Sequence, residues 1–331
     1  MKTIVVALGG NAILQRGEKG TAEEQRANVR ATAQQIVSLI KDGHSVVVTH
    51  GNGPQVGSIL IQNELARDRV PAMPMDICGA ESQGMIGYMM QMYIRNWLRE
   101  AGLDVPVVTV VTQVKVRKDD PAFRNPTKPV GPFRDQTYAK TRQDVFGEKW
   151  IEDSGRGWRR VVPSPDPESI VEAASIRALV EEGHVAISVG GGGIPVVEEW
   201  DGSLVGVEAV IDKDLGAERL ATAVCADMLV ILTDVNGAAI NYGTPQEKWL
   251  EEVTYDELAR CEKEGHFKEG SMGPKVHALL RFIEHGGKEG VISSLDRVLD
   301  AVSGKTGTRL VSARQELRTP DVRRRKDGAA P

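Results

Sequence analysis

Short runs of apolar residues recur along the chain at the length of a buried β-strand. They occupy residues 3–8, 45–49, 105–111, 185–189 and 228–233. Most positions in each run are apolar and do not alternate with polar ones, as expected for strands that are covered on both faces. Two shorter runs, 291–293 and 309–312, predict further strands. Residues 196–208, with Asp201-Gly202 at their centre, predict a hairpin.

Between these runs, apolar residues recur at helical spacing. Thr21 and Glu24 form a capping box ahead of one such stripe. The other clear helices are predicted at residues 54–67, 76–98, 213–225, 255–263 and 275–285. Asp166 has the character of an N-cap with Pro167 at the first helical position, which predicts a helix from there to about Glu182. This alternation of strand and helix predicts an α/β fold with a parallel sheet that is covered on both faces.

The pattern of apolar and polar residues changes between Arg117 and Ser164. Five prolines fall in this segment, and its eleven basic residues outnumber seven acidic ones. No clear periodicity is visible there. We therefore interpret residues 117–164 as an inserted basic excursion or lid and not as part of the core.

Composition narrows the class of protein. The chain has 331 residues, of which 41% are apolar and 26% charged, and its net charge is −5. It is therefore not a disordered chain or a general nucleic-acid binder. No apolar stretch approaches the ~18 residues that a membrane span needs. The three widely spaced cysteines have no zinc or redox spacing, so we expect reduced thiols and a cytoplasmic location.

The 35 glycines are in excess, and several cluster where a predicted strand ends. The clusters are Gly9-Gly10-Asn11, Gly51-Asn52-Gly53 and Gly190 to Gly193. Ligands bind beyond the carboxyl ends of parallel strands, and free backbone amides there suit anions. The Walker pattern is absent and the dinucleotide pattern GxGxxG fails on spacing, so a phosphate would be bound by another scaffold. Substituting Gly10, Gly51 or Gly191 should harm catalysis more than the same change at Gly43 or Gly102.

Three lysines at element boundaries are candidate phosphate ligands: Lys128, Lys213 and Lys275. Asp214 is either an ordinary acid in the first turn of a helix or the group that positions the lysines. His50 is a candidate general base, although a structural histidine is the favoured interpretation. No histidine has metal-ligand spacing, and no protein-only metal site is predicted.

These residues belong to segments that resemble carbamate kinases, of the amino-acid kinase superfamily. The resemblance runs from residue 2 to about 312. It rests on segments that begin with ALGGNA, THGNGPQVG and ESQGMIGY, continue with KPVGP, RRVVPSP and GGGGIPV, and end with VIDKD, LTDV and GSMGPK. Superfamily relatives such as acetylglutamate kinase carry a lysine just before the first glycine motif. Here Ala7 and Leu8 stand in that region. The resemblance to carbamate kinases implies that Lys128 from the insertion takes the place of the missing lysine.

The resemblance implies a three-layer αβα sandwich with an open, mainly parallel eight-stranded sheet and a protruding subdomain at 117–164. It implies one domain over 1–314, with a carbamate half at about 1–183, a nucleotide half at about 184–314 and a basic tail at 315–331. It also implies a homodimer that transfers a phosphoryl group reversibly between ATP plus carbamate and ADP plus carbamoyl phosphate, with Mg²⁺ on the nucleotide. In the family's catabolic setting this reaction forms ATP in the arginine deiminase pathway.

The resemblance assigns roles to individual residues. Lys128, Lys213 and Lys275 would balance charge on the transferring group, and Asp214 would hold the lysines in place. Carbamoyl and phosphoryl oxygens are expected at Gly9, Gly10, Asn11, Gly51, Asn52 and Gly53. The nucleotide is expected at Gly191, Gly192, Asp234, Tyr242, Met272 and Gly273. Because carbamate is already an anion, no general base is required.

Three alternatives compete with this interpretation. The chain could be another superfamily enzyme that acts on a different small acid, or a non-catalytic nucleotide-binding protein on the same scaffold. The missing lysine at Ala7 and the presence of Lys128 argue against the first, and the intact phosphate lysines and glycine loops argue against the second. A Rossmann-type oxidoreductase fails on the glycine spacing.

Overall fold

The computed structural model describes residues 1–15, 17–153, 155–268 and 270–312. Its largest sheet has eight strands, and each neighbouring pair is parallel except β16 and β17. In spatial order the strands are β15 (Glu252–Thr254), β17 (Thr308–Val311), β16 (Glu289–Ser294), β12 (Met228–Thr233), β1 (Thr3–Leu8), β2 (Ser45–His50), β9 (Val185–Ile187) and β3 (Val107–Thr109). The predicted mainly parallel sheet of eight strands is confirmed.

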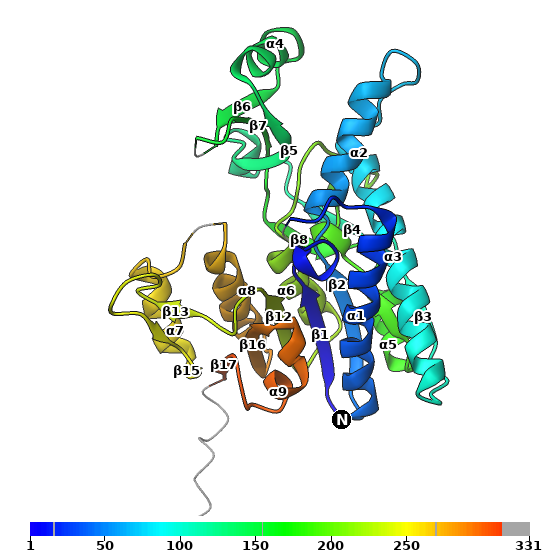
Figure 1. Ribbon diagram of the computed structural model, residues 1–331, viewed down its shortest axis with the longest axis vertical. Helices are drawn as coiled ribbons and strands as arrows, with labels where there is room; N and C mark the ends of the chain where they lie inside the picture. The colour runs from blue at the N-terminus through cyan, green and yellow to red at the C-terminus, as the bar shows by residue number, and fades with distance from the viewer. Residues whose placement is uncertain (16, 154, 269, 313–331) are drawn as a thin grey trace, which may run out of the picture.

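Helices cover both faces of this sheet, which makes the predicted three-layer αβα sandwich (Figure 1). One face packs against α1 (Ala22–Lys41), α3 (Met75–Glu100) and α9 (Val298–Val302). The other packs against α5 (Ala173–Glu181), α6 (Lys213–Ala223), α7 (Tyr255–Lys263) and α8 (Met272–Glu284). Within β1, Val6 faces the first cluster and Val5 the second, so a continuously apolar strand serves both layers.

A second sheet contains β11 (Leu204–Gly206), β10 (Ile194–Glu198), β4 (Gln113–Val116) and β8 (Pro167–Ile170). The predicted hairpin is confirmed by the antiparallel pair β10–β11. The helix predicted from Asp166 is wrong over its first part, because Pro167 opens β8 and α5 begins at Ala173. β8 is an edge strand, where proline's missing N–H costs no ladder hydrogen bond.

Residues 117–164 leave the second sheet after β4 and return to it at β8, and we call them the protruding subdomain. They contain β5 (Lys128–Arg134), α4 (Gln136–Phe146), β6 (Lys149–Glu152), β7 (Trp158–Val162) and the 3₁₀ turn η2 (Pro121–Phe123). Three of these segments form a small antiparallel sheet in the order β5-β7-β6. In Figure 1 the subdomain stands above the main body, beside the upper end of α2 (Gly53–Ala66). The predicted excursion is real, but it has a regular fold of its own.

The carboxyl ends of the parallel strands meet at one edge of the main sheet, where β2 leads into α2. Short elements complete the fold: η1 (Gly10–Ala12), η3 (Gly190–Gly192), η4 (Leu295–Arg297), β13 (Ala239–Ile240) and β14 (Lys248–Trp249). The capping box of Thr21 and Glu24 is present at the start of α1.

Among the described residues, every helix is too short or too polar to span a bilayer. The tail prediction falls outside the described residues.

Candidate active site

Three glycine loops meet at the carboxyl edge of the main sheet. The Gly9 N–H donates to the Leu232 carbonyl at 3.1 Å, and the Gly51 N–H donates to the Leu8 carbonyl at 3.0 Å. Gly191 has φ of +69°, and a Cβ placed on it would lie 2.2 Å from the Asn52 amide nitrogen. The loops after β2 and β9 therefore pack so closely that a side chain at Gly191 would collide with Asn52, and the loop after β1 lies against Gly51.

Polar side chains from α3 fix these loops. The Gln83 amide nitrogen donates to the Gly190 carbonyl at 3.0 Å, and its oxygen accepts the Thr112 N–H at 2.8 Å. The Asn52 amide nitrogen donates to the Ser82 hydroxyl oxygen at 2.8 Å. Sequence reasoning did not assign these supporting roles, although Ser82 and Gln83 lie inside the ESQGMIGY segment.

Asp214 bridges two of the predicted lysines. Its Oδ1 accepts from Lys213 Nζ and its Oδ2 from Lys275 Nζ, both at 2.8 Å. Lys213 and Asp214 open α6, where the Asp212 carboxylate caps the helix by accepting the Asp214 N–H. Lys275 comes from the first turn of the neighbouring α8. Asp214 is 2% exposed, so the bridge lies out of bulk water.

Burial and charge act in opposite directions on this cluster. Burial lowers the pKa of Lys213, but the charge and hydrogen bond of Asp214 outweigh it and raise that pKa above its usual value. For Lys275 burial dominates, and with help from the charge of Lys213 it lowers the pKa despite Asp214. Burial also opposes ionisation of Asp212, yet Lys128 and its hydrogen bond lower the pKa of that carboxyl. The cluster thus depends on its two carboxylates to keep the cations charged.

Lys128 reaches the same place from the protruding subdomain. Its Nζ donates to Asp212 Oδ2 at 2.8 Å. All three predicted lysines line one cavity of about 310 Å³, which we call the lysine cavity. The residues of the glycine loops that also line it are Gly10, Gly51, Asn52, Gly53 and Gly191. The structure therefore brings together predicted residues that are far apart in sequence.

Arg159 on β7 also lines the lysine cavity, and sequence reasoning missed it. Its Nε donates to the Gly131 carbonyl at 3.2 Å, and its guanidinium lies 5.2 Å from the Phe133 ring centroid. The RRVVPSP segment was the available signal, but the pattern did not tell which of its two arginines faces the cavity. The charged lining consists of four basic and two acidic side chains, a net of two positive charges.

A larger cavity adjoins the lysine cavity, and a third cavity adjoins that one in turn. The Asn11 cavity, of about 730 Å³, shares Gly10, Lys213 and Lys275 with it and is also lined by Gly9, Asn11 and Asp234. The Tyr242 cavity, of about 810 Å³, shares Asp234 with the Asn11 cavity.

The remaining residues predicted for the nucleotide lie elsewhere. Met272 and Gly273 form the first turn of α8, next to Lys275. Gly191 lines the lysine cavity, and Gly192 packs against the Ile211 backbone. Their assignment to the nucleotide stays a prediction.

His50 is buried beneath the loops and not poised as a base. Burial lowers its pKa to about 4, and its Nδ1 lies 3.0 Å from the Gly51 carbonyl. It is therefore neutral at pH 7, which agrees with the structural interpretation.

A sequence model of the amino acid kinase family matches residues 2–294, so the chain belongs to that family. Carbamate kinase of Thermococcus kodakarensis is 60% identical over 314 residues, which cover 94% of this chain and 99% of that relative. Carbamate kinase of Pyrococcus horikoshii is 57% identical over 93% of this chain and 98% of its own length. The structure of carbamate kinase from Giardia lamblia bound to AMP-PNP has a TM-score of 0.90 and 48% identity, and the match covers 94% of this chain and 98% of that one.

Within the family this chain is placed among the carbamate kinases, and it is an ATP-binding transferase that moves a phosphoryl group to carbamate. The expectations drawn from the sequence for family, fold and reaction are confirmed. The alternatives of another small-acid kinase and of a non-catalytic protein are not supported by these full-length relatives.

Proposed function

We propose that the phosphoryl group is transferred at the junction of the lysine cavity and the Asn11 cavity. The observation that supports this is the Asp214 bridge, because Lys213 and Lys275 line both cavities and are held at 2.8 Å by one buried carboxylate. Phosphoryl transfer depends mainly on positioning and charge neutralisation. Lys213, Lys275 and Lys128 then neutralise the transferring group, and Asp214 positions the first two.

Carbamoyl phosphate occupies the lysine cavity in this proposal. The backbone N–H groups of Gly10, Asn52 and Gly53 would hold its oxygens, with Asn11 beside them in the adjoining cavity. The N–H groups of Gly9 and Gly51 are instead used inside the protein, where they donate to the Leu232 and Leu8 carbonyls and hold the loops in place. Its two negative charges match the net of two positive charges on the cavity lining. ADP or ATP occupies the Asn11 and Tyr242 cavities, where Asp234 lies between the two spaces.

The chemistry needs no proton transfer. An anionic oxygen of carbamate attacks the γ-phosphorus of ATP, the bond to the β–γ bridging oxygen breaks, and that oxygen leaves as part of ADP. In the reverse direction a β-phosphate oxygen of ADP attacks carbamoyl phosphate and carbamate leaves. His50 is neutral and buried, and it takes no part.

Mg²⁺ fits this site as a metal that arrives on the nucleotide. Among the described residues no group of three or more His, Cys, Asp or Glu side chains could hold an ion. Asp212 and Asp214 already pair with lysines, whereas the Asp234 carboxylate accepts from the Thr233 hydroxyl and lines both nucleotide cavities. Mg²⁺ prefers phosphate oxygens and water to an all-protein cage, and when bound it would shield the nucleotide's charge.

The cellular setting follows from the same chemistry. We propose that the enzyme acts in the cytoplasm, forms ATP and serves arginine catabolism. We also propose that residues 1–183 bind carbamate and that residues 184–314 bind the nucleotide.

We also propose a homodimer through α3, on which Ile77, Met85 and Tyr88 are exposed along one helical face. Light scattering should give twice the monomer mass for the native chain and the monomer mass for Tyr88→Asp.

The experiment on the site measures ATP formation from carbamoyl phosphate and ADP, with acetyl phosphate as an alternative donor. Lys213→Ala and Lys275→Ala should each lower kcat by ~10²-fold or more, with an unchanged circular dichroism spectrum. Lys263→Ala, on the exposed side of α7, is the control and should keep normal turnover. Near-normal turnover in either site variant would overturn the assignment.

A further inference from the structure

The protruding subdomain is joined to the main body by an apolar contact. Val130 of β5 and Val162 of β7 pack with Val56 and Ile59 of α2 in one buried cluster. The amino end of α2 begins at the Gly51-Asn52 loop, and the subdomain lies beside this helix (Figure 1). Further along α2, Ile59 and Glu64 contact the subdomain. One helix therefore contacts both the phosphate loops and the element that carries Lys128.

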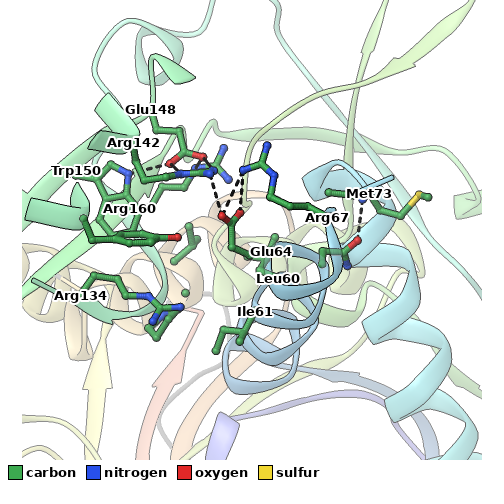
Figure 2. A pocket seen from close by; sticks show the side chains of 16 residues that line it. Leu60, Ile61, Glu64, Arg67, Met73, Arg134, Arg142, Glu148, Trp150 and Arg160 are labelled. Carbon is green, nitrogen blue, oxygen red and sulfur yellow. Dashed lines mark hydrogen bonds and ion pairs between the residues drawn. The ribbon is translucent and has the colours of Figure 1, made fainter. Parts of the chain in front are cut away.

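Beside this contact lies a network of ion pairs that the reaction does not use directly. We call it the clasp, and it consists of Glu64, Arg142, Glu148, Arg160 and Glu208. Figure 2 shows the Arg142 guanidinium between Glu64 and Glu148. Arg142 Nη1 donates to Glu64 Oε1 at 3.1 Å, which joins α4 to α2, and its Nε donates to Glu148 Oε2 at 2.9 Å. Its Nη2 also donates to Glu148.

A second link of the clasp reaches the segment ahead of α6. Arg160 Nη2 donates to Glu208 Oε2 at 2.9 Å. The other oxygen of Glu208 accepts the N–H of Met75, the first residue of α3, at 2.8 Å. The subdomain is thus tied to α2 by Arg142 and to the start of α3 by Arg160.

The Arg142–Glu148 pair of the clasp is shielded in a way that isolated surface ion pairs are not, whereas Glu208 in the second link is 48% exposed. The side chains of Arg142 and Glu148 are only 13% and 10% exposed. Glu148 also accepts from the Trp150 indole N–H at 2.9 Å. Burial opposes ionisation of Glu148, but Arg142 and Trp150 outweigh it and lower the pKa of that carboxyl. Bidentate, shielded pairs of this kind fix geometry better than exposed ones.

Lys128 is coupled to the clasp through the β5–β7 ladder. Val130 pairs with Arg160 and Lys128 pairs with Val162, so the clasp arginine and Lys128 lie two ladder positions apart, about 7 Å along the strand. A change in how the subdomain sits on α2 is therefore passed directly to the Lys128 ammonium group at Asp212.

We propose that the clasp of Glu64, Arg142, Glu148, Arg160 and Glu208 is a positioning device that holds the protruding subdomain on α2, so that Lys128 meets the transferring phosphoryl group. This inference rests on the proposed role of Lys128. The clasp residues line none of the three cavities assigned to the substrates, and they act on the reaction only through the placement of that lysine.

The test compares Glu64→Gln in the native chain and in a Lys128→Ala background. In the native chain, Glu64→Gln should lower kcat about tenfold, leave KM for ADP unchanged and preserve the melting temperature within a few degrees. In the Lys128→Ala background the same substitution should change kcat less than twofold, because the group that it positions is gone. An equal loss in both backgrounds, or no loss in either, would overturn the proposal.

Two further variants sharpen the result. Arg160→Gln breaks the second link and should behave as Glu64→Gln does in both backgrounds. Lys149→Gln is the control and should keep normal kcat, because the exposed Lys149 ammonium donates to Asn125 within the subdomain and makes no link to α2 or α3. If Lys128→Ala alone kept normal turnover, the proposed function of Lys128 would fail, and that outcome is read independently of the clasp variants.

Discussion

Replacing Asp214 with asparagine removes one negative charge from between two lysines and changes almost nothing in volume. Both ammonium groups lie 2.8 Å from the carboxylate, and the side chain is buried. The charged lining of the lysine cavity would change from a net of two to three positive charges. Removing one partner of a buried pair costs about 3–5 kcal/mol, because the remaining charge is left uncompensated.

The cost should appear in turnover and in its pH dependence. We expect kcat for ATP formation to fall ~10²- to 10³-fold, the range typical of losing a preorganised electrostatic group. Asp214 raises the pKa of both lysines, while burial lowers it. Without Asp214 the lysines lose their protons at lower pH, so the alkaline decline of kcat should move to lower pH.

The assay is kcat against pH from 6 to 10 for the native enzyme, Asp214→Asn and Asp214→Glu. Asp214→Glu keeps the charge at a changed distance, so it should lose turnover and keep the alkaline decline near its native pH. If Asp214→Asn declined at the same pH as the native enzyme, the lysines would not depend on this carboxylate and the reasoning would be refuted.

Three further predictions address other parts of the site. Arg159→Gln should raise KM for carbamoyl phosphate about tenfold and leave KM for ADP unchanged in steady-state assays, and an equal rise in both constants would contradict a contact with the carbamoyl end. His50 binds a proton in the unfolded chain below its usual pKa of 6.5 but in the folded chain only near 4. Stability is therefore lost as pH falls between these values, and the native chain should lose about 2 kcal/mol from pH 7 to pH 5 through this group. Urea titrations should show that His50→Gln lacks this loss, and the same loss in that variant would contradict the assignment. Gly191→Ala should lower kcat at least tenfold, whereas Gly102→Ala, at a similar φ with open space around it, should lower only the melting temperature.

The main sheet was predictable because its strands are buried on both faces. In β1 and β12 nearly every position must be apolar, so the run itself marks the strand. The subdomain gives no such signal, because β5 is an edge strand that contains Pro129 and Pro132 and is only partly buried. The prediction of a helix from Asp166 was wrong for a related reason, because Asp-Pro is compatible both with the start of a helix and with an edge strand.

Individual residues of the site were predictable from the sequence, but the ion pairs and hydrogen bonds between them were not. Glycines at strand ends and lysines at helix starts carry a local signal. The bond from Lys275 to Asp214 spans 61 positions of sequence and depends on how α8 packs against α6. Arg159 and Arg160 are adjacent in sequence, and only the strand's alternation sends one to the lysine cavity and the other to the clasp.

The order of strands in the main sheet has a consequence for how the chain can be divided. β9, which follows residue 183, lies between β2 and β3, and β1 is hydrogen-bonded along its length to β12. Residues 1–183 alone would lack an interior strand, so two separately expressed fragments should regain activity only by assembling together. The seam between the proposed carbamate and nucleotide halves is a backbone ladder that aligns Leu8 with Leu232. The register of β1 on β12 therefore fixes the position of the proposed carbamate site relative to the proposed nucleotide site. Because hydrogen bonds hold this register, the two sites can shift along the strands only in steps of whole residues.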